Sequence, residues 1–288
     1  MENKILLTGA TGNIGKQLTK EFLSAGKFIR LGVHSAEKAA SLKNDKCEIV
    51  EMDFFNPGNL EKVLDGIEKV FFLTPLAPNM VLMSKNFIDT AKKAKVKHIV
   101  RLSGLGADIE PGIMLSRWHR EIEKIIMDSS IDYTFLRPNS FMQNYIAYTS
   151  TSIKNNSAFY LPLEDAKISL VDVRDIASVA FKALTENGHE KKAYNITGQE
   201  AISNNEIAEI FSRLLGRKIS YISISDKDVY NNMISAGMPE IIVNSLLELY
   251  SINRNGYTAN ITDTVEKVTK RKPITFSQFA SDNISFFK

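Results

Sequence analysis

A glycine-rich segment near the N-terminus has the residue types and the spacing that bind phosphate. Gly9, Ala10, Thr11, Gly12, Asn13, Ile14 and Gly15 follow an apolar run and precede Leu18 and Phe22, which continue from Ile14 at helical spacing. Glycine lets the chain turn sharply and lets a phosphate approach the backbone, while the amides at a helix N-terminus stabilise its charge. The segment therefore predicts a pyrophosphate site between a first strand and a first helix. Its Gly-x-x-Gly-x-x-Gly spacing differs from the common Gly-x-Gly-x-x-Gly pattern, so the prediction depends on its place in the chain.

The end of the second predicted strand indicates which dinucleotide binds. NAD-selective folds often place a carboxylate there to bind the ribose 2′-hydroxyl, and residues 28–36 contain no carboxylate. His34 and Ser35 occupy the turn instead, with Arg30 before them and Lys38 after them. Such side chains can bind a 2′-phosphate, whereas a carboxylate would repel it. We therefore predict NADPH as the cofactor with NADH as the alternative; the competing interpretation is that these are ordinary exposed charges and a loop histidine.

Alternating strands and helices must position these residues. Apolar runs predict strands at residues 28–33, 48–52, 70–73, 98–102 and 133–136, with helical patterns between them. This alternation predicts an α/β fold, a Rossmann-type doubly wound parallel sheet with right-handed crossovers. The pattern becomes less regular after residue 138, where a smaller C-terminal α/β lobe begins. We expect residues 1–150, joined by 171–198, to form the nucleotide-binding domain, and residues 199–288 with 151–170 to form a substrate-binding lobe.

Composition excludes several classes of function. The 36 basic and 33 acidic residues nearly balance and form no long block, so nothing indicates binding to nucleic acid. Cys47 is the sole cysteine, and four scattered histidines have no metal-ligand spacing, so we expect neither a disulfide nor a metal. No apolar stretch approaches the roughly 20 residues that span a bilayer. We expect a cytoplasmic protein without a membrane partner, as a monomer or a homodimer.

Two carboxylates near residue 174 have the residue type of a general acid or base. Asp172 and Asp175 lie just before an apolar helical pattern over residues 176–184. Aspartate is a preferred residue at helix N-termini because its oxygen accepts from free amides. We therefore expect Asp175 to cap this helix rather than to catalyse.

The order of several segments resembles the NmrA-like family of atypical short-chain dehydrogenases. The resemblance begins with the segment Thr8–Gly15 and continues at Lys97–Ser103, Tyr133–Met142, Val171–Ala177 and Tyr194–Gly198, which together span nearly the whole chain. Within the family the sequence is most similar to NAD(P)H-dependent quinone, azo-dye and triphenylmethane-dye reductases. Their Gly-His-Glu-x-Lys and Ala-Gly-x-Pro segments have counterparts at Gly188–Lys192 and Ala236–Pro239.

The resemblance implies which strand ends line the cofactor. Beside the end of strand two, it points to Leu73, Thr74, Pro75, Ser103, Gly104, Pro138, Asn139, Ser140 and Phe141. Loops at the carboxyl ends of parallel strands are where open α/β sheets bind ligands. Asn139 suits a carboxamide and Phe141 suits a planar ring, whereas the alternative is that all are ordinary turns. After strand three, Asp53 and Phe54 suit the adenine, although Phe54 suits the core equally well.

One departure from the family's wider relatives bears on mechanism. Typical short-chain dehydrogenases carry Tyr-x-x-x-Lys on the helix after strand five, where the tyrosine exchanges a proton with substrate. If Glu123 aligns with the family's helix glutamate, Leu115 takes the tyrosine place and His119 the lysine place. His119 is thus the sole catalytic candidate, either by contacting the nicotinamide ribose or by transferring a proton. The competing interpretation is that His119 is an inert helix residue.

Three functions remain open. The first is an NAD(P)H-dependent oxidoreductase that transfers hydride to a quinone, azo dye or similar small, planar, apolar electrophile, whose product takes its proton from water. The second is a redox-sensing regulator that binds NADP(H) without turnover. A sugar-nucleotide epimerase or dehydratase is third, because it needs the proton exchange for which no phenol is present.

Overall fold

The computed structural model describes residues 4–288, and its backbone divides into two compact units. The first unit comprises the described residues up to Gly112 together with Ser116–Pro138 and Ile176–Asn195. The second comprises Ile113–Leu115, Asn139–Asp175 and Ile196–Lys288. The change of unit thus falls at Pro138, earlier than the residue 150 expected from the sequence. The role expected for the second unit, substrate binding, stays a prediction.

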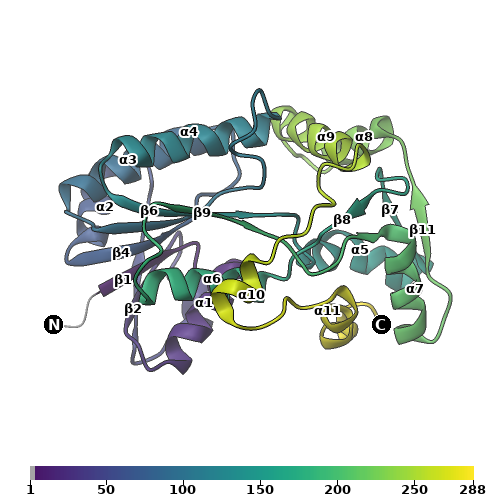
Figure 1. The fold of residues 1–288 in the computed structure, drawn as a ribbon, viewed down its shortest axis with the longest axis horizontal. Helices are drawn as coiled ribbons and strands as arrows, with labels where there is room; N and C mark the ends of the chain where they lie inside the picture. The colour runs from purple at the N-terminus through teal and green to yellow at the C-terminus, as the bar shows by residue number, and fades with distance from the viewer. Residues whose placement is uncertain (1–3) are drawn as a thin grey trace. The chain divides into compact units, whose positions relative to one another are not determined.

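A seven-stranded sheet organises the first unit (Figure 1). Its order is β3 (Cys47–Glu51), β2 (Ile29–Val33), β1 (Lys4–Thr8), β4 (Ile67–Phe72), β5 (His98–Leu102), β6 (Asp132–Pro138) and β9 (Lys192–Ile196). The pairings from β3 through β6 are all parallel. The chain winds outward from β1 to β3 and then in the other direction from β4, so β1 and β4 form the switch point of a doubly wound sheet. The predicted Rossmann-type α/β fold is confirmed.

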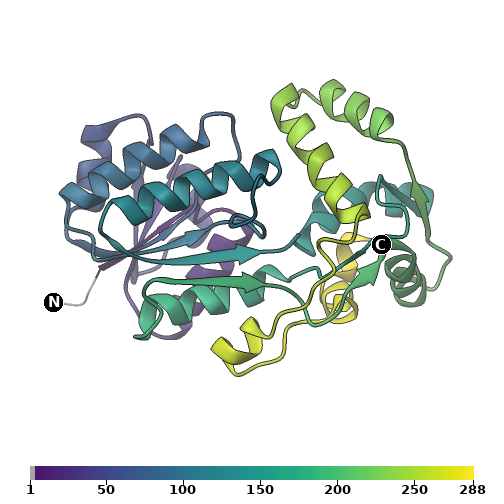
Figure 2. The same cartoon turned by 45° about the horizontal axis from the view of Figure 1, so that its top comes forward.

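Helices cover both faces of this sheet, which is why its strands are continuous apolar runs. On one face, α2 (Pro57–Leu64), α3 (Met80–Lys93) and α4 (Met114–Asp128) pack against β4 and β5 through one core cluster. Figures 1 and 2 show α3 and α4 side by side over the strands. On the other face, α1 (Asn13–Ser24) meets α6 (Val173–Thr185), where the rings of Phe22 and Phe181 make an edge contact at 4.9 Å. A short 3-10 helix, η1 (Glu37–Leu42), follows β2.

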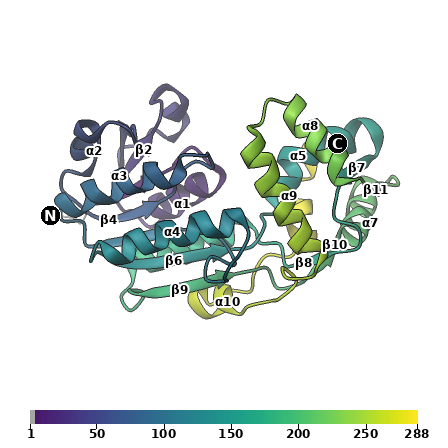
Figure 3. The ribbon, with the colours of Figure 1, turned by 90° about the horizontal axis from the view of Figure 1, so that it is seen from above.

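The second unit is built from short strand pairs and helices (Figure 3). β7 (Ala158–Leu161) pairs in parallel with β11 (Ser220–Ser223), and β8 (Lys167–Ile168) pairs antiparallel with β10 (Ile202–Ser203). Its helices are α5 (Gln143–Asn156), α7 (Asn204–Leu215), α8 (Asp226–Ser235), α9 (Glu240–Arg254), α10 (Thr264–Thr269), α11 (Phe276–Asp282) and the 3-10 turn η2 (Ile284–Phe286). Ser203 and Glu206 form a capping box at the start of α7, and Gly216 ends that helix in the left-handed conformation.

Candidate dinucleotide site

The carboxyl edge of the sheet gathers the predicted segments of the first unit. The glycine turn follows β1, His34 follows β2, Leu73 follows β4 and Ser103 follows β5. Hydrogen bonds join neighbouring ends: the Thr8 hydroxyl donates to the Leu73 carbonyl at 2.8 Å and accepts from the Leu73 amide at 2.7 Å. The Ser103 amide donates to the carbonyl of Leu136 on β6 at 2.7 Å. Because these strands are parallel, this edge is where such a sheet binds its ligand.

The three glycines of the turn are there for different reasons. Gly9 has φ +65°, and a Cβ there would lie 2.8 Å from Cδ2 of Leu73. A Cβ on Gly15 would lie 2.2 Å from the Gly9 carbonyl oxygen and 2.6 Å from Ala10 Cα. Gly12 has an ordinary φ of −78°, is exposed, and its Cβ would meet only the Gly9 oxygen, at 3.3 Å. The fold therefore requires Gly9 and Gly15, whereas Gly12 keeps the backbone bare toward solvent.

The N-terminus of α1 fits a phosphate. Gly12 is its N-cap, no side chain caps it, and its first turn contains no acidic residue. Helix geometry leaves the first amides without partners inside the helix, and the helix dipole adds positive potential there. Ala10 and Ile14 are buried and anchor the turn, while Thr11 is half-buried and Asn13 is exposed. A bare glycine at the start of a helix is the arrangement that commonly binds a phosphate, and its role toward a pyrophosphate in this chain stays a prediction.

The end of β2 presents both signs of charge. His34 and Lys38 are exposed and Ser35 is half-buried. The Ala36 amide donates to Oε1 of Glu51 at 3.0 Å, so a carboxylate from the end of β3 lies beside this turn. Glu51 could not be predicted from strand two alone, because it is the last residue of β3. The parallel pairing of Val33 with Glu51 is the signal that would have found it.

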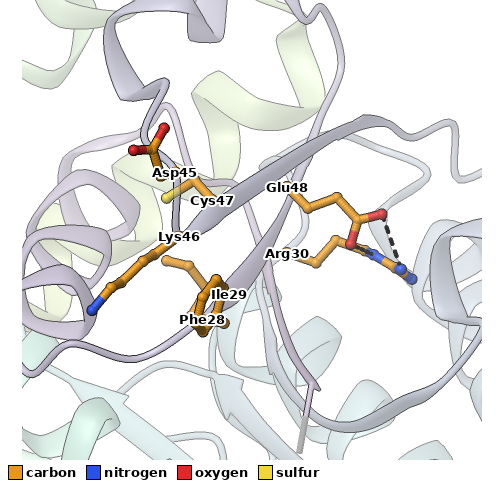
Figure 4. A pocket seen from close by; sticks show the side chains of 7 residues that line it. All are labelled: Phe28, Ile29, Arg30, Asp45, Lys46, Cys47 and Glu48. Atoms are coloured by element: carbon orange, nitrogen blue, oxygen red, sulfur yellow. Dashed lines mark hydrogen bonds and ion pairs between the residues drawn. The ribbon is translucent and has the colours of Figure 1, made fainter. Parts of the chain in front are cut away.

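Arg30 does not take part in this edge, contrary to expectation. Its side chain is buried, donates to both carboxylate oxygens of Glu48 at 2.9 and 3.1 Å, and donates to the carbonyls of Val63 and Asp65 at 2.8 and 2.9 Å. Figure 4 shows this pair beside a hollow of about 170 Å³ at the start of β2 and β3. The two carbonyls lie at the end of α2, where a cation is stabilised, and they hold the guanidinium away from any 2′-phosphate.

Of the pair predicted to contact adenine, one residue belongs to the core. Phe54 packs edge-on against Phe72 and Phe87, with ring centroids 6.3 and 6.0 Å apart, so the alternative interpretation of this residue as core holds. Asp53 is exposed, and its Oδ1 accepts from the Phe55 amide at 2.8 Å. The ring exposed beside Asp53 is that of Phe55. The role of Asp53 toward adenine stays a prediction.

The ends of β5 and β6 are tied together by a buried ion pair. Ser103 Oγ donates to Oε1 of Glu123 at 2.6 Å, and the same carboxylate accepts from Arg137 Nε at 3.0 Å and Nη2 at 2.6 Å. Glu123 is 3% exposed. Arg137 also reaches Asp108 at 2.6 Å. This network fixes Ser103 and the start of the following loop, where Leu105 donates to the Pro138 carbonyl at 3.0 Å.

His119 lies against Gly104 and carries no charge at neutral pH. A Cβ on Gly104 would come within 2.9 Å of His119 Cδ2, so the glycine lets the imidazole approach the strand end. His119 Nδ1 is buried and has no hydrogen-bond partner among residues 4–288. Burial, with the nearby charge of Arg101, lowers the pKa of His119 to about 3. An imidazolium acid is therefore scarce at neutral pH, and the catalytic role of His119 stays a prediction.

Pro138 ends β6, and the rest of the predicted loop belongs to the second unit. Asn139 is buried; its Nδ2 donates to Ser169 Oγ and the Thr258 carbonyl, both at 2.8 Å, and its Oδ1 accepts from the Ser140 amide. Both amide N–H groups of Asn139 are thus used within the chain. Phe141 is half-buried and bridges to Val171. The cofactor contacts of Asn139, Ser140 and Phe141 stay predictions.

The residue that caps α6 is Asp172, so the prediction that Asp175 caps this helix is wrong. Asp172 Oδ1 accepts from the Arg174 amide at 2.8 Å, and its carboxylate pairs with the Arg174 guanidinium. Asp175 lies one turn further along, where its Oδ2 accepts from the Ile274 amide at 2.8 Å. Its Oδ1 is buried without a partner among the described residues, and burial raises the pKa of Asp175 to about 6. Both carboxylates therefore have structural roles: Asp172 caps α6, and Asp175 binds the backbone at Ile274.

Two further kinds of site are missing from the described chain. Within residues 4–288, no cluster of three or more His, Cys, Asp or Glu side chains is placed to hold a metal ion. No helix in that range has the length and apolar character to cross a bilayer.

The fold and this edge define a dinucleotide-binding protein of the Rossmann class. Comparison with known proteins narrows the class: the chain belongs to the NmrA-like family, whose model matches residues 1–280. It is 37% identical over 283 residues to an NAD(P)H azoreductase of Xenophilus azovorans, covering 98% of this chain and 99% of that protein.

Two solved structures share the fold over nearly the whole chain. An NADPH-dependent quinone oxidoreductase of Escherichia coli, in complex with NADPH, superposes with a TM-score of 0.87 at 26% identity and covers 97% of this chain and 99% of its own. A triphenylmethane reductase of Citrobacter sp. superposes with a TM-score of 0.87 at 25% identity, covering 98% and 99%. The family resemblance predicted from the sequence is confirmed.

Proposed function

We propose that this chain is an NADPH-dependent reductase, with NADH as the weaker cofactor, that passes a hydride to a quinone, an azo dye or a similar planar electrophile. The observation that carries the proposal is the bare Gly12 at the start of α1, in a chain 37% identical over nearly its whole length to an NAD(P)H azoreductase. A protein that only needed a tight turn would need Gly9 and Gly15 but not Gly12.

Residues of the first unit hold the two ends of the cofactor in this proposal. The first-turn amides of α1 bind the pyrophosphate, and Ser35, His34 and Lys38 bind the 2′-phosphate. Leu73, Thr74 and Pro75 with Ser103 and Gly104 line the nicotinamide end, since they follow β4 and β5 at the same edge. When bound, the nicotinamide supplies a hydride, and the protein supplies position and electrostatics.

The lack of a protein acid favours acceptors that need none. Leu115 takes the tyrosine place of the wider short-chain dehydrogenases, which makes this chain an atypical member of that class. His119, in the lysine place, is neutral because its pKa is lowered to about 3. A quinone or azo acceptor becomes an anion that takes its proton from water, whereas carbinol oxidation and epimerisation both need proton exchange with a side chain.

Steady-state oxidation of NADPH across a panel of quinones, azo dyes and triphenylmethane dyes tests this function. We expect turnover with at least one acceptor class, a lower KM for NADPH than for NADH, and no turnover in Gly12→Val. Cofactor affinity measured in parallel by calorimetry separates the outcomes. Tight NADPH binding with no acceptor reduced would favour the redox-sensing regulator, and no binding would refute the site itself.

A further inference from the structure

A buried arginine lies at the edge that the proposed function assigns to the nicotinamide. Arg101 is on β5 and is 2% exposed. Its Nη1 donates to the carbonyls of Phe72 and Leu102, the last residues of β4 and β5, and its Nη2 donates to Thr74 Oγ1 at 3.3 Å. Thr74 is one of the residues expected to line the cofactor. The guanidinium therefore lies, enclosed, at the carboxyl ends of these two strands, with its carbon 5.1 Å from the centroid of the Phe72 ring.

The charge of Arg101 is not neutralised by direct contact. Among residues 4–288 no carboxylate oxygen lies within 4.0 Å of it, and its Nε is buried without a hydrogen-bond partner. Glu123 is the nearest acidic influence, but that carboxylate is bound by Arg137 and Ser103. Buried arginines are usually paired, because an unpaired charge in a poorly solvated place is costly. A buried charge of this kind at a ligand-binding edge is a candidate for a functional role.

Arg101 keeps its charge under the same burial that removes the charge of His119. Burial lowers the pKa of Arg101 to about 9, well above neutral pH, whereas the pKa of His119 falls to about 3. His119 Nδ1 is the second buried polar atom in this area without a partner in the described chain. The lysine place on α4 is thus uncharged, and the fixed positive charge of the edge comes from β5.

We propose that Arg101 determines acceptor specificity: its guanidinium favours neutral acceptors, which become anions when they take up hydride, over cationic dyes. This inference rests on the proposed function. With a quinone, two electrons and one hydrogen pass from NADPH to the acceptor, NADP⁺ forms, and the quinone becomes a hydroquinone anion that then takes a proton from water. A nearby cation stabilises that anion. A cationic triphenylmethane dye instead loses its charge in the reaction, and a nearby cation disfavours its approach.

The same charge discriminates between the two oxidation states of the cofactor. The nicotinamide ring is neutral in NADPH and positive in NADP⁺, so Arg101 weakens the binding of NADP⁺ in particular. The ratio of the Kd values for NADP⁺ and NADPH therefore measures the effect of the Arg101 charge without any turnover. We expect wild-type protein to bind NADPH roughly tenfold more tightly than NADP⁺, the effect of one unit charge near a protein interior.

The test compares Arg101→Gln, which removes the charge, with Arg101→Lys, which keeps it. In Arg101→Gln we expect the Kd ratio of NADP⁺ to NADPH to approach one. We expect kcat/KM for a neutral quinone to fall roughly tenfold while kcat/KM for a cationic dye stays or rises. Arg101→Lys should retain the wild-type ratios. Arg30→Gln is the matched control, because Arg30 is also buried and binds two carbonyls but lies at the start of β2.

The outcomes separate this inference from the proposed function. If kcat/KM of Arg101→Gln falls equally for neutral and cationic acceptors and the Kd ratio is unchanged, Arg101 only holds the strand ends. The proposed reductase function would then remain supported. A wild type that reduces no acceptor but whose Kd ratio depends on residue 101 would overturn the reductase and keep the charge effect. Should Arg101→Gln not fold, a wild-type Kd ratio near one would still overturn the inference.

Discussion

Gly12→Val separates the need of the fold from the need of a ligand. The backbone at Gly12 is in an ordinary extended conformation, with φ −78° and ψ 175°, and the nearest atom to an added Cβ is 3.3 Å away. The added Cβ would press on the backbone oxygen of Gly9, so the turn must shift by a few tenths of an ångström, and we expect the change to cost the fold about 1–2 kcal/mol. Domains of this kind have about 5–15 kcal/mol of stability, and the variant should stay folded.

The expected effect of Gly12→Val on NADPH binding is larger than its effect on the stability of the fold. At an NADPH concentration of about 100 times Kd, binding stabilises wild-type protein by about 2.7 kcal/mol. At about 2–4 °C per kcal/mol, this raises Tm by roughly 5–10 °C. A valine at position 12 places its methyl groups where the pyrophosphate meets the backbone, so we expect the rise to disappear. Thermal unfolding with and without NADPH measures both quantities in one experiment.

Two other glycines serve as controls. Gly58 on α2 also has room for a Cβ, whose nearest neighbour would be Asn56 Oδ1 at 3.7 Å, so Gly58→Val should keep the rise in Tm with NADPH. Gly15→Ala should lower Tm in the absence of NADPH, because its Cβ would press on backbone at 2.2 Å. A Gly12→Val protein that unfolds at the wild-type Tm and keeps the full rise with NADPH would refute the reasoning.

Three further predictions address cofactor choice, mechanism and stability. Ser35→Asp should shift preference toward NADH by about 1–2 kcal/mol, seen as the ratio of the two Kd values, and a wild type that already prefers NADH would contradict it. His119→Ala should reduce kcat with a quinone only modestly, because the imidazole is uncharged; a loss of about 10³-fold with intact NADPH binding would show a general acid. Asp175→Asn should stabilise the protein at pH 8 and have little such effect near pH 4. The pKa of Asp175 is about 6 in the folded protein and about 3.9 in the unfolded chain, so ionisation of Asp175 lowers the free energy of unfolding by up to about 3 kcal/mol as the pH rises from about 4 to above 6. Equal effects in urea unfolding at both pH values would argue against burial of that charge.

Local patterns predicted the fold and the glycine turn well. The apolar runs of β2 and β5 are buried at every residue, so their signal is strong and continuous. The turn between β1 and α1 needs Gly15 for its close approach to Gly9 and Ala10 and needs Gly9 for its positive φ, and both requirements are local enough for sequence spacing to record them.

Side-chain direction could not be predicted in the same way. Arg30 and the end of β2 are close in sequence, but Arg30 turns toward carbonyls of Val63 and Asp65, more than thirty residues away. Glu51 reaches the turn at Ala36 only because β3 pairs with β2. Phe54 and Phe55 are adjacent and equally aromatic, and only packing against Phe72 and Phe87 decides which is core. Each of these choices depends on neighbours that a single sequence does not identify.

Burial lowers the pKa of both basic side chains at this edge, but only His119 loses its charge at neutral pH, and that difference explains why the expected effects of their substitution differ. An imidazole under burial gives up its proton, as the lowered pKa of His119 indicates, so removing the ring removes little charge. A guanidinium begins from so high a pKa that the same burial leaves Arg101 protonated. If His119 takes the lysine place of Tyr-x-x-x-Lys, as we propose, the positive charge at these strand ends comes from Arg101 on β5. We therefore expect hydride transfer at this edge to depend on a fixed charge and on position, and not on a proton that the protein must give.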